Sequence, residues 1–395
     1  MFARLTGRRK AAAQILALFS MLWVAACQPV SISGNMGGPA LTIDPGAPVQ
    51  VALLVPSGSG DPSDDFLSQN LENAARLAIS DLSGVEIDLR IYATAANPAQ
   101  AASVAQTAVA DGAQIILGPL YAEDANAAGV AVAASGVSVL SFSNNTTIAG
   151  GNVFVLGPTF RNTADRLVRY GARNGIDRYM IVHADDLQGA VGRDAIASAV
   201  RNNGATVAGI QSYALSQQGI LDAAPRIVGA TNAAGADAVF MTAGVNADLP
   251  ILATALPEAG LNPDSTRFIG LTRWNATPQA LALPGLQNGL FALPDQQMTA
   301  IFESRYAAAY GDAPHPVAGL AYDGIAAIGA LVARGGANAL SRASLTQGQG
   351  FQGTTGIFRL LTDGTNERGL AVATVRGNQV VILDPAPRGF GGFGS

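Results

Sequence analysis

The chain has 395 residues, enough for two or three domains, and 49% of them are hydrophobic while only 13% are charged. This composition supports a large buried core and excludes a disordered chain. Four of the 23 basic residues lie in the first ten positions, which leaves 19 basic against 28 acidic residues in the rest. Such an acidic protein is not expected to have nucleic acid or an anionic membrane surface as its main partner.

The first 26 residues have the pattern of an export signal peptide. A basic segment, Arg4–Lys10, precedes an apolar run, Ala11–Ala26, that is short for a transmembrane helix. The run ends before Cys27, the only cysteine, in a pattern that resembles a lipobox, where the cysteine is lipidated and becomes the first mature residue. Gln28 in the next position resembles the signal that sorts lipoproteins to the outer membrane. We therefore predict a periplasmic lipoprotein anchored in the inner leaflet of that membrane.

Residues 27–48 are rich in Pro, Gly and Ser and are predicted to form a flexible linker after the lipid anchor. Short apolar runs then alternate with helical patterns, in two similar sets. The first set predicts strands at 49–55, 87–91, 115–117 and 137–140, and helices at 64–82, 98–110 and 122–134. The second predicts helices at 163–173, 189–202, 220–234 and 247–259, and strands at 179–183, 206–211, 238–242 and 268–271. Strand–helix–strand order requires parallel sheets with helical crossovers.

The pattern changes towards the C-terminus. A strand at 290–293 and helices at 295–310 and 316–332 come first. Strands at 356–361 and 370–375 then flank a turn at Asp363-Gly364, and a strand at 379–383 closes a β-hairpin across Gly377-Asn378. We expect a first lobe of residues 49–157 plus 290–345, a second lobe of 158–289 plus 350–383, and a flexible tail at 384–395.

This order of elements resembles the type I periplasmic-binding fold, in the branch of the leucine/isoleucine/valine-binding proteins. The resemblance covers Val49–Leu383. It depends on four short motifs: Ile116-Leu117-Gly118-Pro119, Leu140-Ser141-Phe142-Ser143, Ala321-Tyr322-Asp323-Gly324-Ile325, and Phe351-Gln352-Gly353-Thr354-Thr355-Gly356. It implies an α/β fold with two similar lobes of parallel sheet flanked by helices, three crossovers between the lobes, and a C-terminal β-hairpin.

Ligands of such sheets bind beyond the carboxyl ends of the strands. In amino-acid binders of this fold, a hydroxyl residue shortly after Gly-Pro helps to hold the ligand carboxylate, whereas here Leu120, Tyr121 and Glu123 follow. We predict a ligand site at the strand ends formed by Gly118, Pro119, Tyr121, Ser141, Phe142, Ser143, Asn144, Arg273 and Trp274. Five of these residues also have a structural interpretation. Tyr121 and Phe142 could pack between the lobes, Ser143 and Asn144 could cap a loop, and Trp274 could belong to the core.

Catalytic motifs are not evident, because His183 and His315 lie far apart and without metal-ligand spacing. We therefore expect a binding protein that needs no cofactor or metal. As a lipoprotein of this fold, the chain resembles penicillin-binding protein activators, which implies a non-catalytic regulator of peptidoglycan synthesis with a penicillin-binding protein as its partner. The alternative is an ABC-transporter receptor for an amino acid or similar small molecule. The missing hydroxyl and the outer-membrane signal favour the regulator.

Overall fold

The computed structural model describes residues 42–44 and 46–390. The predicted signal peptide, Cys27, most of the linker and the last five residues lie outside the described residues. Within the described part, no helix is long and apolar enough to cross a membrane. The described residues form two larger sheets, of five and seven strands, and a small sheet of three strands.

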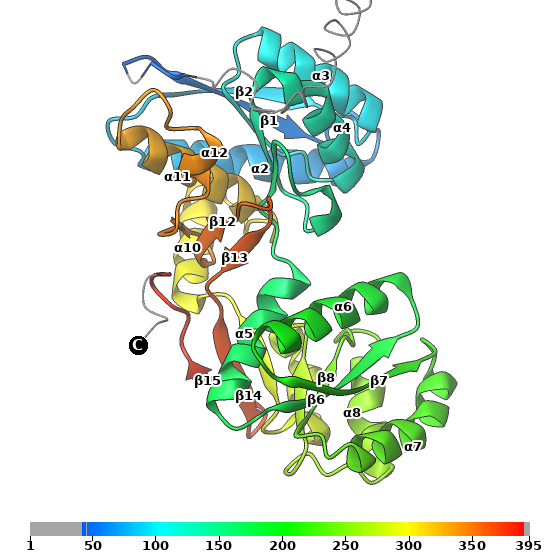
Figure 1. The fold of residues 1–395 in the computed structure, drawn as a ribbon. Helices are drawn as coiled ribbons and strands as arrows, with labels where there is room; N and C mark the ends of the chain where they lie inside the picture. Colours follow the sequence, from blue (N-terminus) through cyan, green and yellow to red (C-terminus); the bar gives the residue numbers. More distant parts are fainter. Residues whose placement is uncertain (1–41, 45, 391–395) are drawn as a thin grey trace, which may run out of the picture. The chain divides into compact units, whose positions relative to one another are not determined.

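The first sheet is entirely parallel, as predicted, and has the order β2-β1-β3-β4-β5. Its strands are β1 (Val49–Val55), β2 (Ile87–Ala93), β3 (Ile115–Leu117), β4 (Ser138–Ser141) and β5 (Val153–Val155). The helices around it are α2 (Pro62–Asp81), α3 (Pro98–Ala110), α4 (Ala122–Val132), α10 (Gln296–Tyr310) and α11 (Ala318–Ala333). Figure 1 shows α3 and α4 together beside β1 and β2.

Alternating side chains of β1 explain why helices cover both faces of this sheet. Val51 and Leu53 pack in one core cluster with residues of α2 and α11, whereas Ala52 and Leu54 pack in another with residues of α3 and α4. A strand buried on both faces reads as a continuous apolar run, which is the pattern of parallel sheets. We call the part built around this sheet the first lobe.

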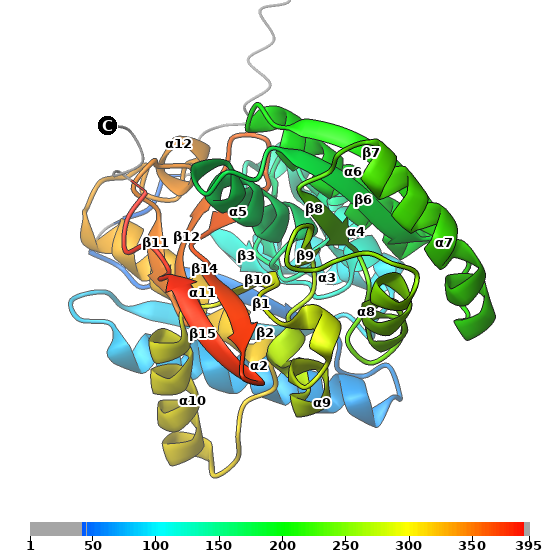
Figure 2. The same ribbon diagram turned by 90° about the horizontal axis from the view of Figure 1, so that it is seen from below.

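The second sheet has the order β15-β14-β10-β9-β8-β6-β7. Its strands are β6 (Arg178–Ala184), β7 (Thr206–Tyr213), β8 (Ala238–Met241), β9 (Arg267–Gly270), β10 (Leu290–Leu293), β14 (Ala371–Arg376) and β15 (Gln379–Asp384). The helices α5 (Phe160–Arg173) and α6 (Leu187–Asn202) contribute to one core cluster, and α7 (Gln217–Ala233) and α8 (Leu249–Glu258) to another. The predicted C-terminal hairpin is confirmed, because β14 and β15 pair antiparallel and lie side by side in Figure 2. We call this part the second lobe.

Two predicted lobe assignments differ from the structure. The strand Leu290–Leu293 was expected in the first lobe, but it pairs with β9 and β14 in the second sheet. The segment after residue 350 was expected in the second lobe. Instead, β11 (Phe351–Gly353), β12 (Gly356–Leu360) and β13 (Asn366–Arg368) form the three-stranded sheet, and Phe351 and Phe358 pack into the core of the first lobe.

The chain passes between the lobes three times, which confirms the predicted crossovers: from β5 to α5, from β10 to α10, and from β13 to β14. Polar side chains of β13 hold the first crossover. Asn366 Nδ2 donates to the carbonyl oxygens of Val155 and Gly157, each at 2.8 Å, and Arg368 donates to the carbonyl oxygen of Leu156. The first and third crossovers are therefore joined by hydrogen bonds.

The described part of the predicted tail makes specific contacts. The Asp384 carboxylate lies 2.9 Å from Arg166 and 2.9 Å from Arg173, and the Arg359 guanidinium lies 4.6 Å from the centre of the Phe390 ring. Up to Phe390, therefore, the chain is packed against the protein.

Candidate functional site

The loop after β3 packs closely against the ends of neighbouring strands. Gly118 has a φ of +82°, and a Cβ atom there would overlap the Leu54 carbonyl oxygen, so this position favours glycine. Pro119 is buried, and its carbonyl oxygen accepts hydrogen bonds from Ser141 Oγ at 3.1 Å and from the Phe142 amide at 3.0 Å. The carboxyl ends of β3 and β4 are thereby tied together, as the strand–helix–strand pattern predicts.

The side chains after β4 mostly face protein. Ser141 is fully buried, and its Oγ also accepts from the Ser143 amide at 3.1 Å. Ser143 is 6% exposed, and its Oγ accepts from the Asn145 amide. Phe142 is 2% exposed and packs in the core of the first lobe. The predicted ligand contacts of Ser141 and Phe142 are therefore corrected to structural roles, and Asn144 is the exposed side chain of this segment.

Tyr121 lies at the same edge and makes a contact that the sequence did not reveal. It immediately precedes α4, is 37% exposed, and its hydroxyl donates to Asp64 Oδ1 in the first turn of α2. This hydrogen bond, together with burial and the charge of Asp64, raises the pKa of Tyr121 to about 12.

Asp124, in the first turn of α4, is a second carboxylate at this edge. It is 2% exposed, accepts from Thr94 Oγ1 at 3.1 Å, and has its pKa raised mainly by burial. Asp64 is also buried, at 6% exposure. Acidic residues at a helix start are expected simply as favourable partners of the helix dipole, which is why sequence reasoning passed over both of them.

In the second lobe, the predicted ligand residue Trp274 is part of the core. Trp274 is fully buried and stacks on Phe291 with ring centres 5.3 Å apart. Gly270 and Gly289 make room for the indole, since a Cβ atom at either position would overlap it. The prediction that Trp274 contributes to the ligand site is corrected accordingly. Arg273 is exposed, and no ion pair to it is found among the described residues.

The second lobe also has a buried tyrosine–carboxylate pair at a strand end. The Tyr213 hydroxyl, at the end of β7, donates to Asp248 Oδ2, and Asp248 Oδ1 accepts from the Gly244 amide at 2.7 Å. Burial first, and then this hydrogen bond, raises the pKa of Tyr213. Each lobe therefore carries a Tyr–Asp hydrogen bond near the carboxyl ends of its strands.

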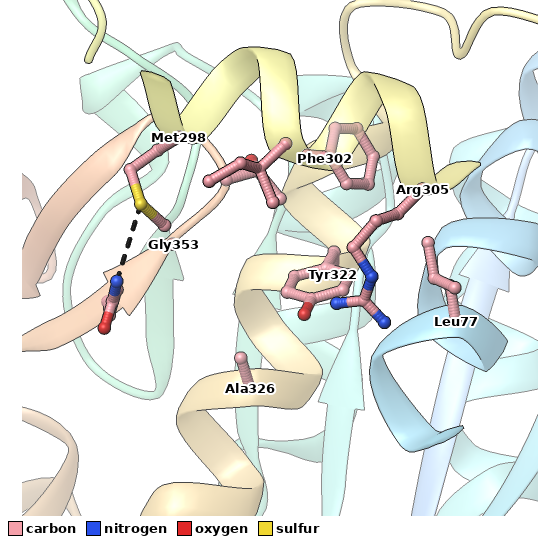
Figure 3. A pocket seen from close by; sticks show the side chains of 10 residues that line it. Leu77, Met298, Phe302, Arg305, Tyr322, Ala326 and Gly353 are labelled. Atoms are coloured by element: carbon pink, nitrogen blue, oxygen red, sulfur yellow. Dashed lines mark hydrogen bonds between the residues drawn. The ribbon is translucent and has the colours of Figure 1, made fainter. Parts of the chain in front are cut away.

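A hollow in the first lobe lies away from these strand ends, between α2, α10, α11 and β11. It has a volume of about 260 Å³ and apolar walls that include Leu77, Met298 and Phe302. Figure 3 shows Arg305 and Tyr322 side by side at one end of it. Both side chains hydrogen-bond to Asp81, and the Arg305 contact in particular lowers the pKa of that carboxyl. None of the predicted ligand residues lines this hollow.

The two histidines have local structural contacts. His183 is buried and its Nδ1 lies 2.8 Å from the Ala184 carbonyl oxygen, while His315 Nδ1 accepts from the Val317 amide at 3.3 Å. Within the described residues, no group of three His, Cys, Asp or Glu side chains is arranged to hold a metal ion.

Comparison with known proteins agrees with the architecture. The sequence profile of a family described as "Periplasmic binding protein" matches residues 48–379. No functionally curated protein matches the chain.

Solved structures share the fold at low identity. A Rhodospirillum rubrum protein, provisionally assigned to a branched-chain amino acid ABC transporter, is 17% identical with a TM-score of 0.70, over 85% of this chain and all of that one. An ABC transporter substrate-binding protein from Desulfitobacterium hafniense, in complex with Leu, is 19% identical with a TM-score of 0.58, over 85% of this chain and 100% of that one. A periplasmic ligand-binding protein of a branched-chain amino acid ABC transporter from Burkholderia xenovorans is 16% identical with a TM-score of 0.63, over 86% and 96%. The profile match spans both lobes and all three crossovers, and the chain therefore belongs to the periplasmic binding protein family.

Proposed function

We propose that this protein is a periplasmic receptor that captures a small organic solute, such as an amino acid, for an ABC transporter. The observation that carries this proposal is the family match over residues 48–379, which includes both lobes. The similar solved structures support it, because they are substrate-binding proteins of ABC transporters and one of them holds leucine. The family also indicates a periplasmic location. The chemistry of the family is binding, and the proposed role is not catalytic.

The side chains at the strand ends indicate which ligand charges would fit. At the first lobe, the exposed Asp65 and Glu123 lie in the helix starts after β1 and β3, beside the buried Asp64 and Asp124, and the segments 56–65 and 116–124 contain no Lys or Arg. This negative edge favours an ammonium group over a carboxylate. At the second lobe, the exposed Arg273 is suited to a carboxylate. A zwitterionic amino acid, with its amine towards the first lobe, satisfies both edges.

Titration calorimetry with the standard L-amino acids tests this proposal. A ligand at a hundred times its dissociation constant should add about 2.7 kcal/mol to the free energy of unfolding. Glu123→Gln and Arg273→Gln should each weaken binding, whereas Arg76→Gln, on an exposed arginine of α2, should leave it unchanged. If no amino acid, oligopeptide or amine binds, the receptor proposal fails.

The penicillin-binding protein activator is the second candidate function, and the comparisons give it less support than the receptor. One observation favours it: the hydroxyl groups near the predicted ligand site are engaged by the protein itself. Those of Ser141 and Ser143 form hydrogen bonds within the loop, and that of Tyr121, close to the expected ligand-binding hydroxyl, donates to Asp64. A site in which these hydroxyl groups are not available to a ligand would suit a regulator that binds its partner through its surface. Co-purification with a penicillin-binding protein, together with no response to any small solute, would establish this candidate over the receptor.

Anchoring through Cys27 is a further part of the proposal and rests on the sequence pattern alone. Cys27→Ser should abolish incorporation of a clickable fatty acid, because no other cysteine is present. Fractionation of the two membranes then tests the predicted outer-membrane position. Lipid labelling that survives Cys27→Ser would exclude the lipoprotein interpretation.

A further inference from the structure

A polar cavity lies beside the first crossover, away from the strand ends discussed above. It has a volume of about 310 Å³. Its walls come from the first turns of α5, the C-terminal end of α6, and the two strands β12 and β13 with the turn between them. The lining residues are Arg161, Asn162, Asp165, Arg169, Asn202, Asn203, Arg359, Leu361, Asn366 and Glu367. Elements of the second lobe and of the three-stranded sheet therefore face each other across it.

Three arginines and two carboxylates line the cavity, which gives the lining an excess of one positive charge in an otherwise acidic protein. Glu367 is held by two of the arginines: its carboxylate oxygens lie 2.9 Å from Arg169 Nη2 and 2.6 Å from Arg359 Nη2. These contacts lower the pKa of Glu367 against the opposing effect of burial. Glu367 is thus held as a carboxylate, and it fixes the guanidinium groups of Arg169 and Arg359 on either side of it.

Arg161 has longer ion pairs than the other two arginines of the cavity. Its Nε lies 3.5 Å from Asp165 and its Nη1 lies 3.6 Å from Asp363, distances too long for strong hydrogen bonds, and its side chain is 42% exposed. It projects from the first turn of α5, where the helix dipole also favours an anion. A guanidinium has five N–H donors, and neither ion pair involves Nη2 of Arg161, so this side chain can still donate hydrogen bonds to a carboxylate or phosphate.

The cavity is also lined by Asn366 of β13, which forms hydrogen bonds that hold the first crossover. Asn366 is 2% exposed, and its Nδ2 donates to the carbonyl oxygens of Val155 and Gly157. Asn162, next to Arg161, donates in turn to the Asn366 carbonyl oxygen at 2.9 Å. An occupant of the cavity would therefore connect α5 with β13 and reinforce the contacts on which the crossover depends.

We propose that this cavity is a regulatory site for a small oxyanion, a carboxylate or a phosphate, which binds to Arg161 with support from Arg169 and Arg359. Binding there stiffens the first and third crossovers and so changes how readily the two lobes move. The site is separate from the strand ends proposed for the solute, and this inference does not rest on the proposed receptor function.

Thermal unfolding of the intact protein tests the site with two probes, inorganic phosphate and succinate. The ionic strength is held constant with sodium chloride, so that screening is the same in all samples. We expect a saturable rise in melting temperature with at least one probe, and the one that saturates at lower concentration identifies the class of anion. Arg161→Gln should weaken the apparent affinity about tenfold, the loss typical of one charge-assisted contact. Arg76→Gln, which removes a similarly exposed positive charge on α2, outside the cavity lining, should retain the wild-type response.

Hydrogen exchange provides the readout for regulation. The bound probe should slow amide exchange in residues 155–168 and 356–368 of the wild-type protein but not of Arg161→Gln. A rise in melting temperature that is equal in both arginine variants would show a general ion effect and overturn the site. Binding that needs Arg161 but leaves exchange in both segments unchanged would overturn the coupling to the crossovers.

Discussion

Arg368 in β13 and Asp323 in α11 form an ion pair that is almost completely removed from solvent. Arg368 Nη1 lies 3.2 Å from Asp323 Oδ2, and the two side chains are 4% and 1% exposed. Asp323 Oδ1 also accepts from the amide and the hydroxyl of Thr354, at 2.7 and 3.0 Å. The pair thus joins α11, the turn after β11, and the third crossover in one buried network.

Removal of one partner should be strongly destabilising, because the other charge is then left buried without compensation. We expect Asp323→Ala to lower the free energy of unfolding by about 3–5 kcal/mol. The double variant Asp323→Leu/Arg368→Met should be more stable than this single variant. Arg76→Ala, which breaks an exposed ion pair with Glu72, should cost no more than about 1 kcal/mol. Urea unfolding of the four proteins measures these differences, and a mild effect of Asp323→Ala would contradict the structural role of the pair.

Gly118→Ala should be destabilising for reasons of conformation and space. The φ of +82° is unfavourable for alanine, and the new Cβ atom would overlap the Leu54 carbonyl oxygen, so we expect a loss of at least about 1–3 kcal/mol. Gly229→Ala is the matched control. Gly229 is exposed in the middle of α7 with no neighbour close to a new Cβ atom, and this change should stabilise by about 0.5–1 kcal/mol. Melting curves that move in the same direction for both variants would contradict this.

The Tyr121–Asp64 hydrogen bond predicts a loss of stability at alkaline pH. The pKa of Tyr121 rises from 10.0 to about 12 in the folded protein, so the folded state holds the phenolic proton more tightly than the unfolded chain. The contribution is fully present below pH 10 and is lost as the pH rises through about 12. Tyr121→Phe, which cannot ionise, should lose less stability over this range than the wild-type protein. Equal pH profiles from chemical unfolding would show that the hydrogen bond does not form in solution.

Trp274 should report the state of the second lobe and not the presence of a ligand. It is the only tryptophan besides Trp23 in the predicted signal peptide, and it is fully buried against Phe291. Its fluorescence should be blue-shifted and resistant to aqueous quenchers until the second sheet unfolds. Solutes that bind at the strand ends should leave this emission unchanged. Efficient iodide quenching of the native protein would contradict the burial of Trp274.

The absence of lysine after position 10 has a direct chemical consequence. If the chain is cleaved before Cys27, its only primary amine is the α-amino group of that cysteine, and acylation there would remove it. Amine-reactive crosslinkers should then fail to join the mature protein to any partner, whereas carboxylate-directed reagents should succeed. Peptide mapping after treatment with an amine-reactive dye checks this. Dye on the N-terminal peptide would show a free amine, and dye elsewhere would contradict the sequence of the mature chain.

The sequence was sufficient to predict the parallel strands of both larger sheets, because strands buried on both faces are read directly as apolar runs between helical patterns. It did not reveal β5, β11 and β13, each three residues long, although β3 of the same length was predicted. The lobe of Leu290–Leu293 also escaped prediction, because a short apolar run does not show which strand it will pair with. In the site, apolar character did not distinguish a binding wall from core, so Phe142 and Trp274 were misplaced. The Tyr121–Asp64 pair joins residues 57 positions apart, and no local pattern connects them.

The pairing of β10 with β14 makes the second sheet depend on residues near the C-terminus. In the folded protein β10 pairs with β9 along one edge, and its other edge is covered by residues 371–376, near the end of the chain. The core of the first lobe also requires the C-terminal part of the chain, because Phe351 and Phe358 pack into it. Neither half is complete until nearly the whole polypeptide is present. A chain that ends before residue 371 therefore leaves a hydrophobic strand edge unpaired, which makes C-terminal truncations prone to aggregate.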